Sequence, residues 1–378
     1  MTTENKKLNI IMIGQKNVPS RDGGIDVVVG ELAPEIAKKG HAVTLLNRKR
    51  KKEKGLPILK EYKGCSLDEC FTINKRAFDA LVHSYFATKR AIKLGKKGKV
   101  DIVHYHAEGP CFFLYKFPKK EKRNYKIVVT IHGIDSKRAK WKGFGSKVLE
   151  ICEKRIVKYA DEIIVLSKKD HDFLLKTYGR ESTIIPNAVS TPEFLAPNTI
   201  EKKWGLKEKD YLLTLARFVP EKGLHYLIEA FLNATKTTGS NKKLVLSGNL
   251  SFDKNYYEKI VNMCKGKDNI ILTGFVDGET VKELYSNAYL YVLPSELEGM
   301  SMSLLEACAY KLPCLISNIE ENIAVTGENV YTFETKNVES LTRVLIDLLK
   351  GKKSLLVSNK KFFTWGEIAK KTIELYER

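Results

Sequence analysis

Residues 9–46 read NIIMIGQKNVPSRDGGIDVVVGELAPEIAKKGHAVTLL. The apolar runs 9–14 and 41–46 have the length and composition of buried strands, and residues 26–40 between them carry apolar side chains at helical spacing. A strand, a helix and a second strand in this order form a βαβ unit, in which the two strands run parallel. This stretch therefore predicts an α/β fold built on a parallel sheet.

The same alternation continues to residue 190 and then begins again. In the first half we expect further strands at 100–106, 126–133, 161–167 and 182–187, and helices at 76–94, 146–160 and 168–179. In the second half we expect strands at 211–217, 243–249, 270–275, 290–295 and 313–317, and helices near 223–236, 253–264, 279–287, 301–310, 338–350 and 362–378. The stretch 190–198 contains prolines and has no periodicity, which is typical of a linker. We predict two Rossmann-like, doubly wound domains, 1–189 and 190–362, that face each other across a cleft.

The composition is that of a globular protein. Of the 378 residues 43% are hydrophobic and 29% are charged, and the mean hydropathy is −0.26, which excludes a disordered or collagen-like chain. No apolar stretch approaches the roughly 18 residues of a spanning helix. The first apolar run is short and ends at a glycine, which is not the layout of a signal peptide, so we expect a cytoplasmic protein. The seven cysteines include no CxxC pair, so we expect reduced, packed thiols.

Positive charge is concentrated in the first half of the chain. Residues 1–190 hold 40 Lys and Arg against 21 Asp and Glu, a net charge of +19, whereas residues 191–378 hold 25 against 24. The densest clusters are at 48–54, 89–99 and 119–123. A solvated surface explains any one cluster equally well, but the asymmetry favours a polyanion, an anionic membrane surface or a phosphate-linked substrate as partner of the first half.

Several residues at the expected strand ends of the first half are candidates for a site. Gly23 and Gly24 precede a helix, where backbone N–H groups can approach an anion, although the pair is also an ordinary turn signal and is not a GxGxxG motif. His132 ends a strand and is followed by a loop glycine and Asp135, which favours a functional role. Further candidates in this half are His104, His106 and Asp135. For the first two, a histidine bonded to a neighbouring carbonyl is an equal alternative.

The second half carries a stronger set. Arg217 ends a strand and Lys222 precedes a helix, so a planar guanidinium and a point charge can clamp a diphosphate. Glu298 lies in a strand-to-helix loop and Glu306 within the following helix, so that one carboxylate can accept ribose hydroxyls while the other meets a reacting sugar. The intervening Gly299, Ser301 and Ser303 permit close approach and supply donors.

With these motifs the chain resembles the retaining glycosyltransferases of family 4, which have the GT-B fold. The resemblance rests on the GGID loop, TIHGID, IIPNAV, ARFVPEKG and the two glutamates Glu298 and Glu306 with seven residues between them, and it covers essentially the whole chain. The sequence is similar to members that build capsule, exopolysaccharide or lipopolysaccharide. It departs from the family pattern at Ala188 and in the glycine-poor loop at Gly248.

The resemblance implies a role for each matching residue. Arg217 and Lys222 would neutralise the leaving diphosphate, Glu298 would contact sugar hydroxyls, and Glu306 would bind the ribose. The implied catalytic set is His132, Arg217, Lys222 and Glu298. The implied donor-binding set is Gly23, Gly24, Arg217, Lys222, Gly248, Glu298, Gly299, Met300, Ser301 and Glu306. His104, His106 and Asp135 are the candidates for the acceptor side. The final helix, 363–378, would pack back on the first domain.

The resemblance also implies a hexosyltransferase that retains the anomeric configuration, uses a nucleotide-sugar donor, commonly UDP-linked, and needs no cofactor. We expect no metal, because no DxD-like acidic cluster sits at a strand end. The expected acceptor is a glycan or a polyprenyl-diphosphate-linked sugar, with no nucleic acid bound. We hypothesise that the clusters 48–54 and 89–99, with Tyr85 and Phe86, hold the enzyme peripherally on the inner face of the cell membrane. The alternatives are a sugar-nucleotide 2-epimerase, a glycan phosphorylase or a non-enzymatic polyanion-binding protein.

Overall fold

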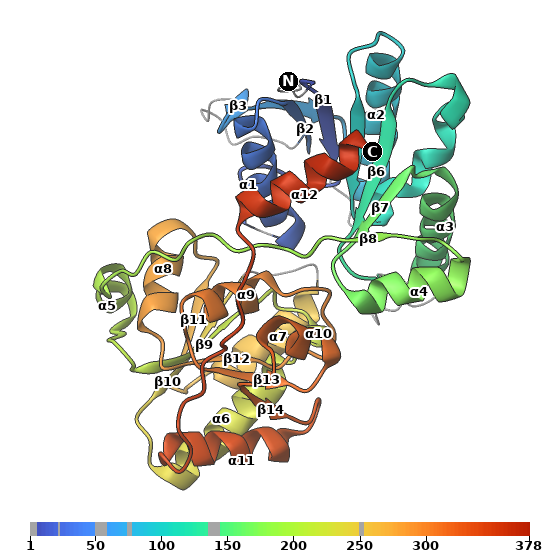
Figure 1. Cartoon of the computed structure of the whole chain (residues 1–378). Coiled ribbons are helices and arrows are strands. Elements are labelled where there is room, and N and C mark those ends of the chain that lie inside the picture. The colour runs from blue at the N-terminus through green and yellow to red at the C-terminus, as the bar shows by residue number, and fades with distance from the viewer. Residues whose placement is uncertain (1–5, 22, 50–58, 74–77, 135–143, 249–252) are drawn as a thin grey trace. The chain divides into compact units, whose positions relative to one another are not determined.

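The computed structural model describes residues 6–21, 23–49, 59–73, 78–134, 144–248 and 253–378 (Figure 1). The chain divides into two compact units. The N-unit comprises residues 1–187 and 363–378, and the C-unit comprises residues 188–362. The division after Asn187 falls two residues before the position that the sequence suggests, because Ala188 already packs with the C-unit.

The N-unit contains an eight-stranded sheet in the order β3-β4-β2-β1-β5-β6-β7-β8. Its neighbouring strands are parallel except for the β3–β4 hairpin. The strands are β1 (Asn9–Ile13), β2 (Ala42–Arg48), β3 (Glu61–Tyr62), β4 (Cys65–Cys70), β5 (Ile102–His106), β6 (Lys126–Ile131), β7 (Glu162–Val165) and β8 (Thr183–Ile184). The helices are α1 (Gly24–Lys38), α2 (Phe78–Gly95), α3 (Phe144–Tyr159), α4 (Lys168–Tyr178) and α12 (Trp365–Glu377), with 3-10 turns η1 (Gly109–Lys116) and η2 (Lys120–Lys122).

The C-unit contains a fully parallel six-stranded sheet in the order β11-β10-β9-β12-β13-β14. The strands are β9 (Tyr211–Leu215), β10 (Lys243–Ser247), β11 (Ile270–Gly274), β12 (Leu290–Leu293), β13 (Cys314–Ser317) and β14 (Tyr331–Phe333). The helices are α5 (Asn198–Trp204), α6 (Leu224–Thr238), α7 (Lys254–Cys264), α8 (Gly278–Asn287), α9 (Met302–Ala309), α10 (Glu320–Thr326) and α11 (Val338–Leu349), and the 3-10 turn η4 spans Pro220–Lys222.

Each sheet has one point at which the chain reverses its direction of travel across the sheet. In the C-unit this switch lies between β9 and β12, and in the N-unit it lies between β1 and β5. Loops that follow the two strands at a switch diverge to opposite faces of the sheet, which leaves room for a ligand between them. The topology thus selects the loops after β9 and β12, and those after β1 and β5, as the places to look for a site.

Helix α12 belongs to the N-unit although it ends the chain, and it lies along α1 (Figure 1). It begins with a capping box in which Thr364 and Glu367 satisfy each other's backbone N–H groups. At its other end the Tyr376 hydroxyl lies 2.6 Å from His104 Nδ1 at the sheet. The capping box thus closes the first turn of the helix, and Tyr376 fixes its last turn to the sheet of the N-unit.

Both faces of each sheet are covered, so most strand residues are buried. All seven cysteines are free and buried, as the reduced, packed thiols expected from the sequence. Among the described residues, no helix is long and apolar enough to cross a membrane.

Candidate active site

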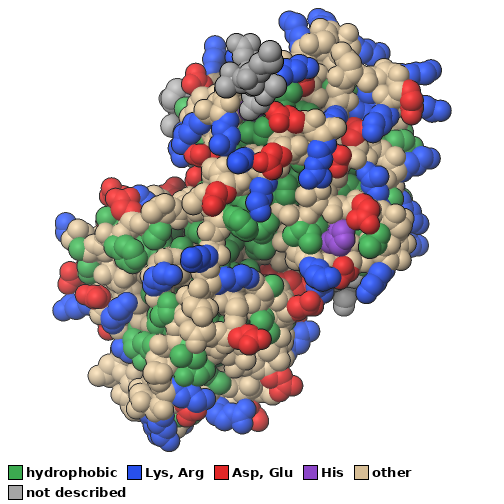
Figure 2. Space-filling model, in the orientation of Figure 1, with side chains coloured by type: hydrophobic (Ala, Val, Ile, Leu, Met, Phe, Trp, Pro, Cys, Tyr) green, Lys and Arg blue, Asp and Glu red, His purple; other side chains and the backbone are tan. Residues whose placement is uncertain are grey.

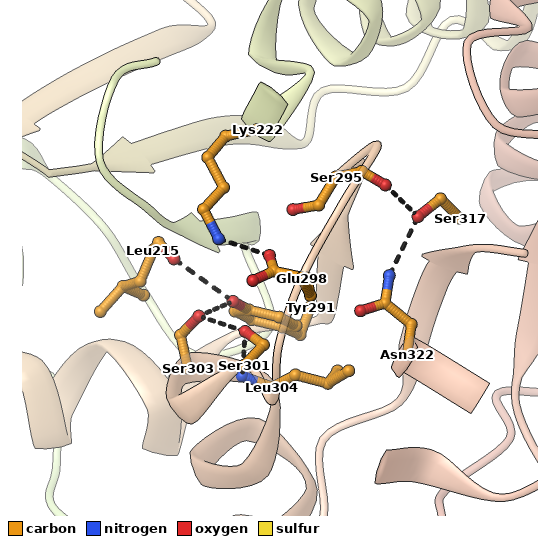
Figure 3. A network of polar contacts seen from close by, with 10 residues as sticks. All are labelled: Leu215, Lys222, Tyr291, Ser295, Glu298, Ser301, Ser303, Leu304, Ser317 and Asn322. Carbon is orange, nitrogen blue, oxygen red and sulfur yellow. Dashed lines mark hydrogen bonds and ion pairs between the residues drawn. The ribbon is translucent and has the colours of Figure 1, made fainter. Parts of the chain in front are cut away.

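Lys222 and Glu298 form a buried ion pair at the switch point of the C-unit (Figure 3). Lys222 ends the 3-10 turn after β9, and Glu298 lies in the loop after the neighbouring strand β12. Their side chains are only 14% and 8% exposed. Water therefore solvates neither charge well, and each is stabilised by its partner. Two oppositely charged groups are thus held where the fold favours a ligand.

The loops that carry this pair are tied together. The Glu296 N–H donates to the carbonyl of Glu221 at 2.8 Å. The Glu296 carboxylate accepts from the Tyr226 hydroxyl at 3.0 Å and pairs with Lys336 at 3.0 Å. Glu296 was not singled out from the sequence, although a second glutamate two residues before Glu298 was a visible signal.

Arg217 lies between β9 and the 3-10 turn and is half-buried. Among the described residues its side chain has no hydrogen-bond or ion-pair partner. The two cations that the sequence suggests as one clamp therefore differ: Arg217 is available, whereas Lys222 is occupied by Glu298. An anion that engages both must share Lys222 with that carboxylate.

The start of α9 carries a chain of hydroxyl contacts (Figure 3). Ser301 is the N-cap residue, and its Oγ accepts from the Leu304 N–H at 3.4 Å and lies 3.2 Å from Ser303 Oγ. The Tyr291 hydroxyl donates to Ser303 Oγ at 2.8 Å. Gly299 and Met300 form the bend between Glu298 and this cap. This chain of hydroxyls holds the start of α9, directly after the bend that follows Glu298.

The other predicted residues of the C-unit, Glu306 and Gly248, come after strands β12 and β10 of the same sheet. Glu306 lies within α9, and its Oε2 accepts from the Tyr285 hydroxyl at 2.9 Å. Gly248 follows β10, and a Cβ there would lie 1.9 Å from the Ala216 carbonyl oxygen, so only glycine fits. Tyr285 and Tyr291 were missed in the sequence because a buried tyrosine on a helix or strand reads as core.

Two further oxygens at this edge are buried and lack partners among the described residues: Ser295 Oγ and Asn322 Oδ1. Both residues are held by Ser317, whose hydroxyl donates to the Ser295 carbonyl at 2.5 Å and accepts from Asn322 at 2.9 Å (Figure 3). Unsatisfied buried polar atoms are uncommon in native proteins, and a polar ligand is one remedy.

In the N-unit, Gly23 caps α1 and Gly24 is its first residue. Asp26, in the first turn, is buried, and its carboxylate accepts from the N–H groups of Lys16 at 2.6 Å and Asn17 at 3.3 Å. Burial raises the pKa of Asp26, and these hydrogen bonds oppose that shift. The carboxylate holds the loop after β1, a role that the sequence did not suggest.

The histidines at the sheet edge differ from expectation. His104 is fully buried, and both ring nitrogens are engaged, Nδ1 by Tyr376 at 2.6 Å and Nε2 by Thr130 at 2.7 Å. Burial lowers its pKa to about 3. The proposed acceptor contact of His104 is therefore wrong, because a strand covered on both faces and a docked terminal helix enclose the ring.

His106 and His132 lie together at the switch point of the N-unit. Nδ1 of His106 is 3.2 Å from Nε2 of His132, and Nε2 of His106 is buried with no partner among the described residues. Burial, with the neighbouring His104 and His132, lowers the pKa of His106 well below its ordinary value. His132 is half-buried. Asp135 lies outside the described residues.

Two family models match successive parts of the chain. The model described as Glycosyltransferase Family 4 matches residues 22–193, and the model described as Glycosyl transferases group 1 matches residues 198–362. The two matches fall on the two halves of the chain, one on each side of the linker.

One relative matched over almost its full length, one matched over part of its length and several solved structures agree with this assignment. An uncharacterized glycosyltransferase of Methanocaldococcus jannaschii is 24% identical over 98% of both chains. The UDP-Gal:alpha-D-GlcNAc-diphosphoundecaprenol alpha-1,3-galactosyltransferase of Escherichia coli is 27% identical over 69% of both chains. In fold, the chain is similar to sucrose-phosphate synthase from Thermosynechococcus elongatus, with a TM-score of 0.78 and 18% identity over 98% of both chains.

A further similar structure is HepE from Anabaena in complex with UDP and glucose, with a TM-score of 0.73 and 14% identity over 98% of this chain and 99% of that one.

The two family models that match the chain both describe glycosyltransferases, which sets aside the epimerase, phosphorylase and non-enzymatic alternatives. The two models and the shared fold lead to one conclusion: the chain belongs to the glycosyltransferases of the GT-B fold, with a family 4 N-terminal part and a group 1 C-terminal part.

Proposed function

We propose that this glycosyltransferase moves a sugar from a nucleoside diphosphate-sugar, UDP-linked by preference, to a glycan or lipid-linked acceptor in cell-surface polysaccharide or glycolipid synthesis. The observation that carries the proposal is the buried Lys222–Glu298 pair at the switch point of the C-unit, with Arg217 in the same segment after β9 as Lys222. Two cations suit a diphosphate, and a carboxylate suits the hydroxyl groups of a sugar. A nucleoside diphosphate-sugar combines both parts in one ligand.

In this proposal each group has a defined task. Arg217 and Lys222 bind the diphosphate, Glu298 accepts from hydroxyls of the transferred sugar, and Glu306 accepts from the ribose. Gly23 and Gly24 approach the donor or the acceptor, His132 contacts the sugar, and backbone groups of 299–301 line the phosphates.

The reaction that we propose retains the anomeric configuration. The acceptor oxygen forms a bond to the anomeric carbon on the face that the leaving group vacates, and the bond between that carbon and the phosphate oxygen breaks. The electron pair passes to the diphosphate, which takes up the acceptor proton. Negative charge grows on the diphosphate in the transition state, where preorganised cations are most effective. Lys222 gains this role as the diphosphate displaces it from Glu298, which frees the carboxylate for the sugar.

A thermal-shift panel of UDP, GDP, ADP and dTDP tests the donor site. A ligand at 100 times its dissociation constant stabilises the folded state by about 2.7 kcal/mol, so the matching nucleotide raises the melting temperature. We expect the largest shift with UDP, and the same shift with EDTA present. The Glu306→Ala variant is expected to lose about 1–3 kcal/mol of nucleotide binding. A protein whose melting temperature none of the four nucleotides raises would contradict the proposal.

The relatives suggest that the acceptor is attached to a lipid. The Escherichia coli relative is named for a diphosphoundecaprenol-linked substrate, and an alpha-monoglucosyldiacylglycerol synthase of Acholeplasma laidlawii is 24% identical over 69% of both chains. An enzyme acting on such an acceptor works at a membrane surface. The N-unit offers a face suited to that surface.

Helix α2 has mainly small residues on its buried side and large aromatic residues on its exposed side. The side buried in the N-unit consists mainly of small residues, among them Ala87, Ala91 and Gly95, whereas Phe78 and Phe86 on the other side are 58% and 38% exposed. Water normally faces the polar side of a surface helix. Exposed aromatic rings on the outer side of α2 are typical of a surface that contacts an apolar partner.

Phe86 belongs to an aromatic-cationic patch, defined here as Phe71, Tyr85, Phe86, Phe113 and Tyr115 with Lys89 and Lys116. Phe71 packs edge-on against Phe86 at 5.2 Å, and Tyr85 does so against Phe113 at 5.3 Å. The ammonium groups of Lys89 and Lys116 lie over the Tyr85 ring at 5.7 and 5.5 Å. Aromatic rings favour the interface of a bilayer, and lysines beside them meet anionic headgroups.

More lysines continue the patch at the end of α2. Lys93, Lys96, Lys97 and Lys99 are exposed, and Figure 2 shows Lys and Arg side chains gathered over the part of the N-unit that contains α2, at the upper right. Each such residue close to an anionic leaflet contributes roughly 1 kcal/mol. The 48–54 cluster of the sequence hypothesis lies mostly outside the described residues, and 89–99 is the part that supports it.

Sedimentation with liposomes tests this surface. We expect the parent to bind vesicles of phosphatidylglycerol and phosphatidylcholine, to bind pure phosphatidylcholine weakly, and to dissociate as salt rises, because the attraction is screened over about 8 Å at physiological salt. A Phe71→Ser, Phe86→Ser variant should bind several-fold less well. The matched control is Phe275→Ser in the C-unit, since Phe275 is also 38% exposed. Equal binding by both variants, or equal binding to both kinds of vesicle, would remove the membrane from the proposal.

A further inference from the structure

Helix α8 holds the linker that leads from the N-unit into the C-unit. The Leu195 N–H donates to Ser286 Oγ at 3.0 Å. The Glu283 carboxylate accepts from the N–H groups of Thr199 and Ile200 at 2.7 and 3.0 Å. Glu283 is buried, so these bonds are protected from water. The start of the C-unit is thus fastened to α8 through its backbone.

The linker also contacts the end of α9, the helix that carries Glu306. The Tyr310 hydroxyl donates to the backbone carbonyl of Glu193 at 3.1 Å. The ring of Phe194 packs edge-on against the Tyr310 ring at 5.3 Å. Tyr310 follows the last residue of α9, so the linker contacts the end of this helix as well as α8.

The contacts continue from Tyr310 to Glu306 through one more ring. Tyr310 stacks on Tyr285 of α8, with ring centroids 5.3 Å apart and planes inclined by 20°. Tyr285 is 1% exposed, and its hydroxyl donates to Glu306 Oε2 at 2.9 Å. A backbone carbonyl of the linker is therefore joined to the carboxylate of Glu306 by two stacked tyrosines.

We propose that Tyr285 positions the Glu306 carboxylate for a nucleotide and that Tyr310 couples this position to the linker. The inference rests on the proposed function, in which Glu306 accepts from the ribose. A carboxylate fixed by a buried donor loses less entropy on binding than a free one. A shift of the linker displaces the Tyr310 ring, and the stacked Tyr285 ring then changes its angle to Glu306. Movement in the linker is thereby translated into nucleotide affinity.

The coupling is tested by the nucleotide dissociation constants of single variants. These constants are measured by calorimetry with the nucleoside diphosphate that gives the largest thermal shift. Tyr285→Phe keeps the ring and removes the hydroxyl that donates to Glu306 Oε2 and to the Ser303 carbonyl, and is expected to raise the constant about five- to tenfold. Tyr310→Leu, which removes the stacked ring, should have an effect of similar size. Glu193→Ala is the control: it removes the exposed ion pair with Lys282 but keeps the backbone carbonyl, and should leave the constant unchanged.

A double-mutant cycle separates positioning from general loosening of the C-unit. In the Glu306→Ala background, Tyr285→Phe and Tyr310→Leu should change the constant less than twofold, because the group through which they act is gone. The coupling would be overturned if the tyrosine variants raised the dissociation constant as much in the Glu306→Ala background as in the parent, or if Tyr285→Phe alone left it unchanged. In either case the proposed function would stand. A parent that binds no nucleoside diphosphate would overturn both.

Discussion

Replacing Arg217 and Lys222 together with alanine is expected to lower kcat by more than about 10³-fold, since loss of one donor to a developing negative charge already costs about 10²–10³-fold. The effect belongs in kcat because the charge on the leaving diphosphate grows between the bound donor and the transition state. Steady-state rates of nucleoside diphosphate release at saturating donor measure it. A folded double variant with a kcat near that of the parent would remove the two cations from the mechanism.

The two positions differ in what their loss does to the fold. Lys222→Ala leaves Glu298 buried without its ion pair, which costs several kcal/mol in other buried pairs, so the double variant can lose stability as well as activity. Arg217→Ala breaks no hydrogen bond or ion pair of the side chain among the described residues and isolates the catalytic effect. Arg343→Ala, at an exposed arginine of α11 in the same unit, is the control for loss of one positive charge.

Much of the fold could be predicted from the sequence because the apolar runs of buried parallel strands stand out locally. Elements were missed where that signal is short or absent. Strand β14 has three residues, and helices α5 and α10 have seven each, too few to establish a period. Strand β4 reads CSLDEC, and its charged residues interrupt the apolar run by which a buried strand is recognised. Its pairing with β2 depends on tertiary context that no window of sequence contains.

The candidate site was predicted residue by residue but not as an arrangement. Lys222 and Glu298 are 76 positions apart, and their pairing follows only from the adjacency of β9 and β12. Nothing in the sequence separates Lys222 from Arg217, because the competition from Glu298 for Lys222 is a property of the folded chain. His104 failed for the same kind of reason: its partner Tyr376 lies 272 residues away on the terminal helix.

Gly223→Ala is expected to destabilise the C-unit by about 2–4 kcal/mol, from strain of an alanine in the left-handed region and overpacking against a backbone that cannot yield easily. Gly223 has φ of +64°, and a Cβ there would lie 2.2 Å from the carbonyl oxygen of Pro294. This contact joins the turn after β9 to the loop after β12, the two segments that carry Lys222 and Glu298. Room for the methyl group can come only from separating those segments.

The matched control is Gly239→Ala at the other end of the same helix. Gly239 has φ of +67° and nothing within 4 Å of an added Cβ, so its variant should lose only the conformational cost of about 1 kcal/mol. The two substitutions share the effect of alanine on the unfolded chain, which cancels in their comparison. Urea unfolding monitored in parallel with nucleotide affinity measures both consequences: Gly223→Ala should lose stability and affinity, and Gly239→Ala a little stability alone. Equal losses in the two variants would mean that the contact with Pro294 does not hold the site together.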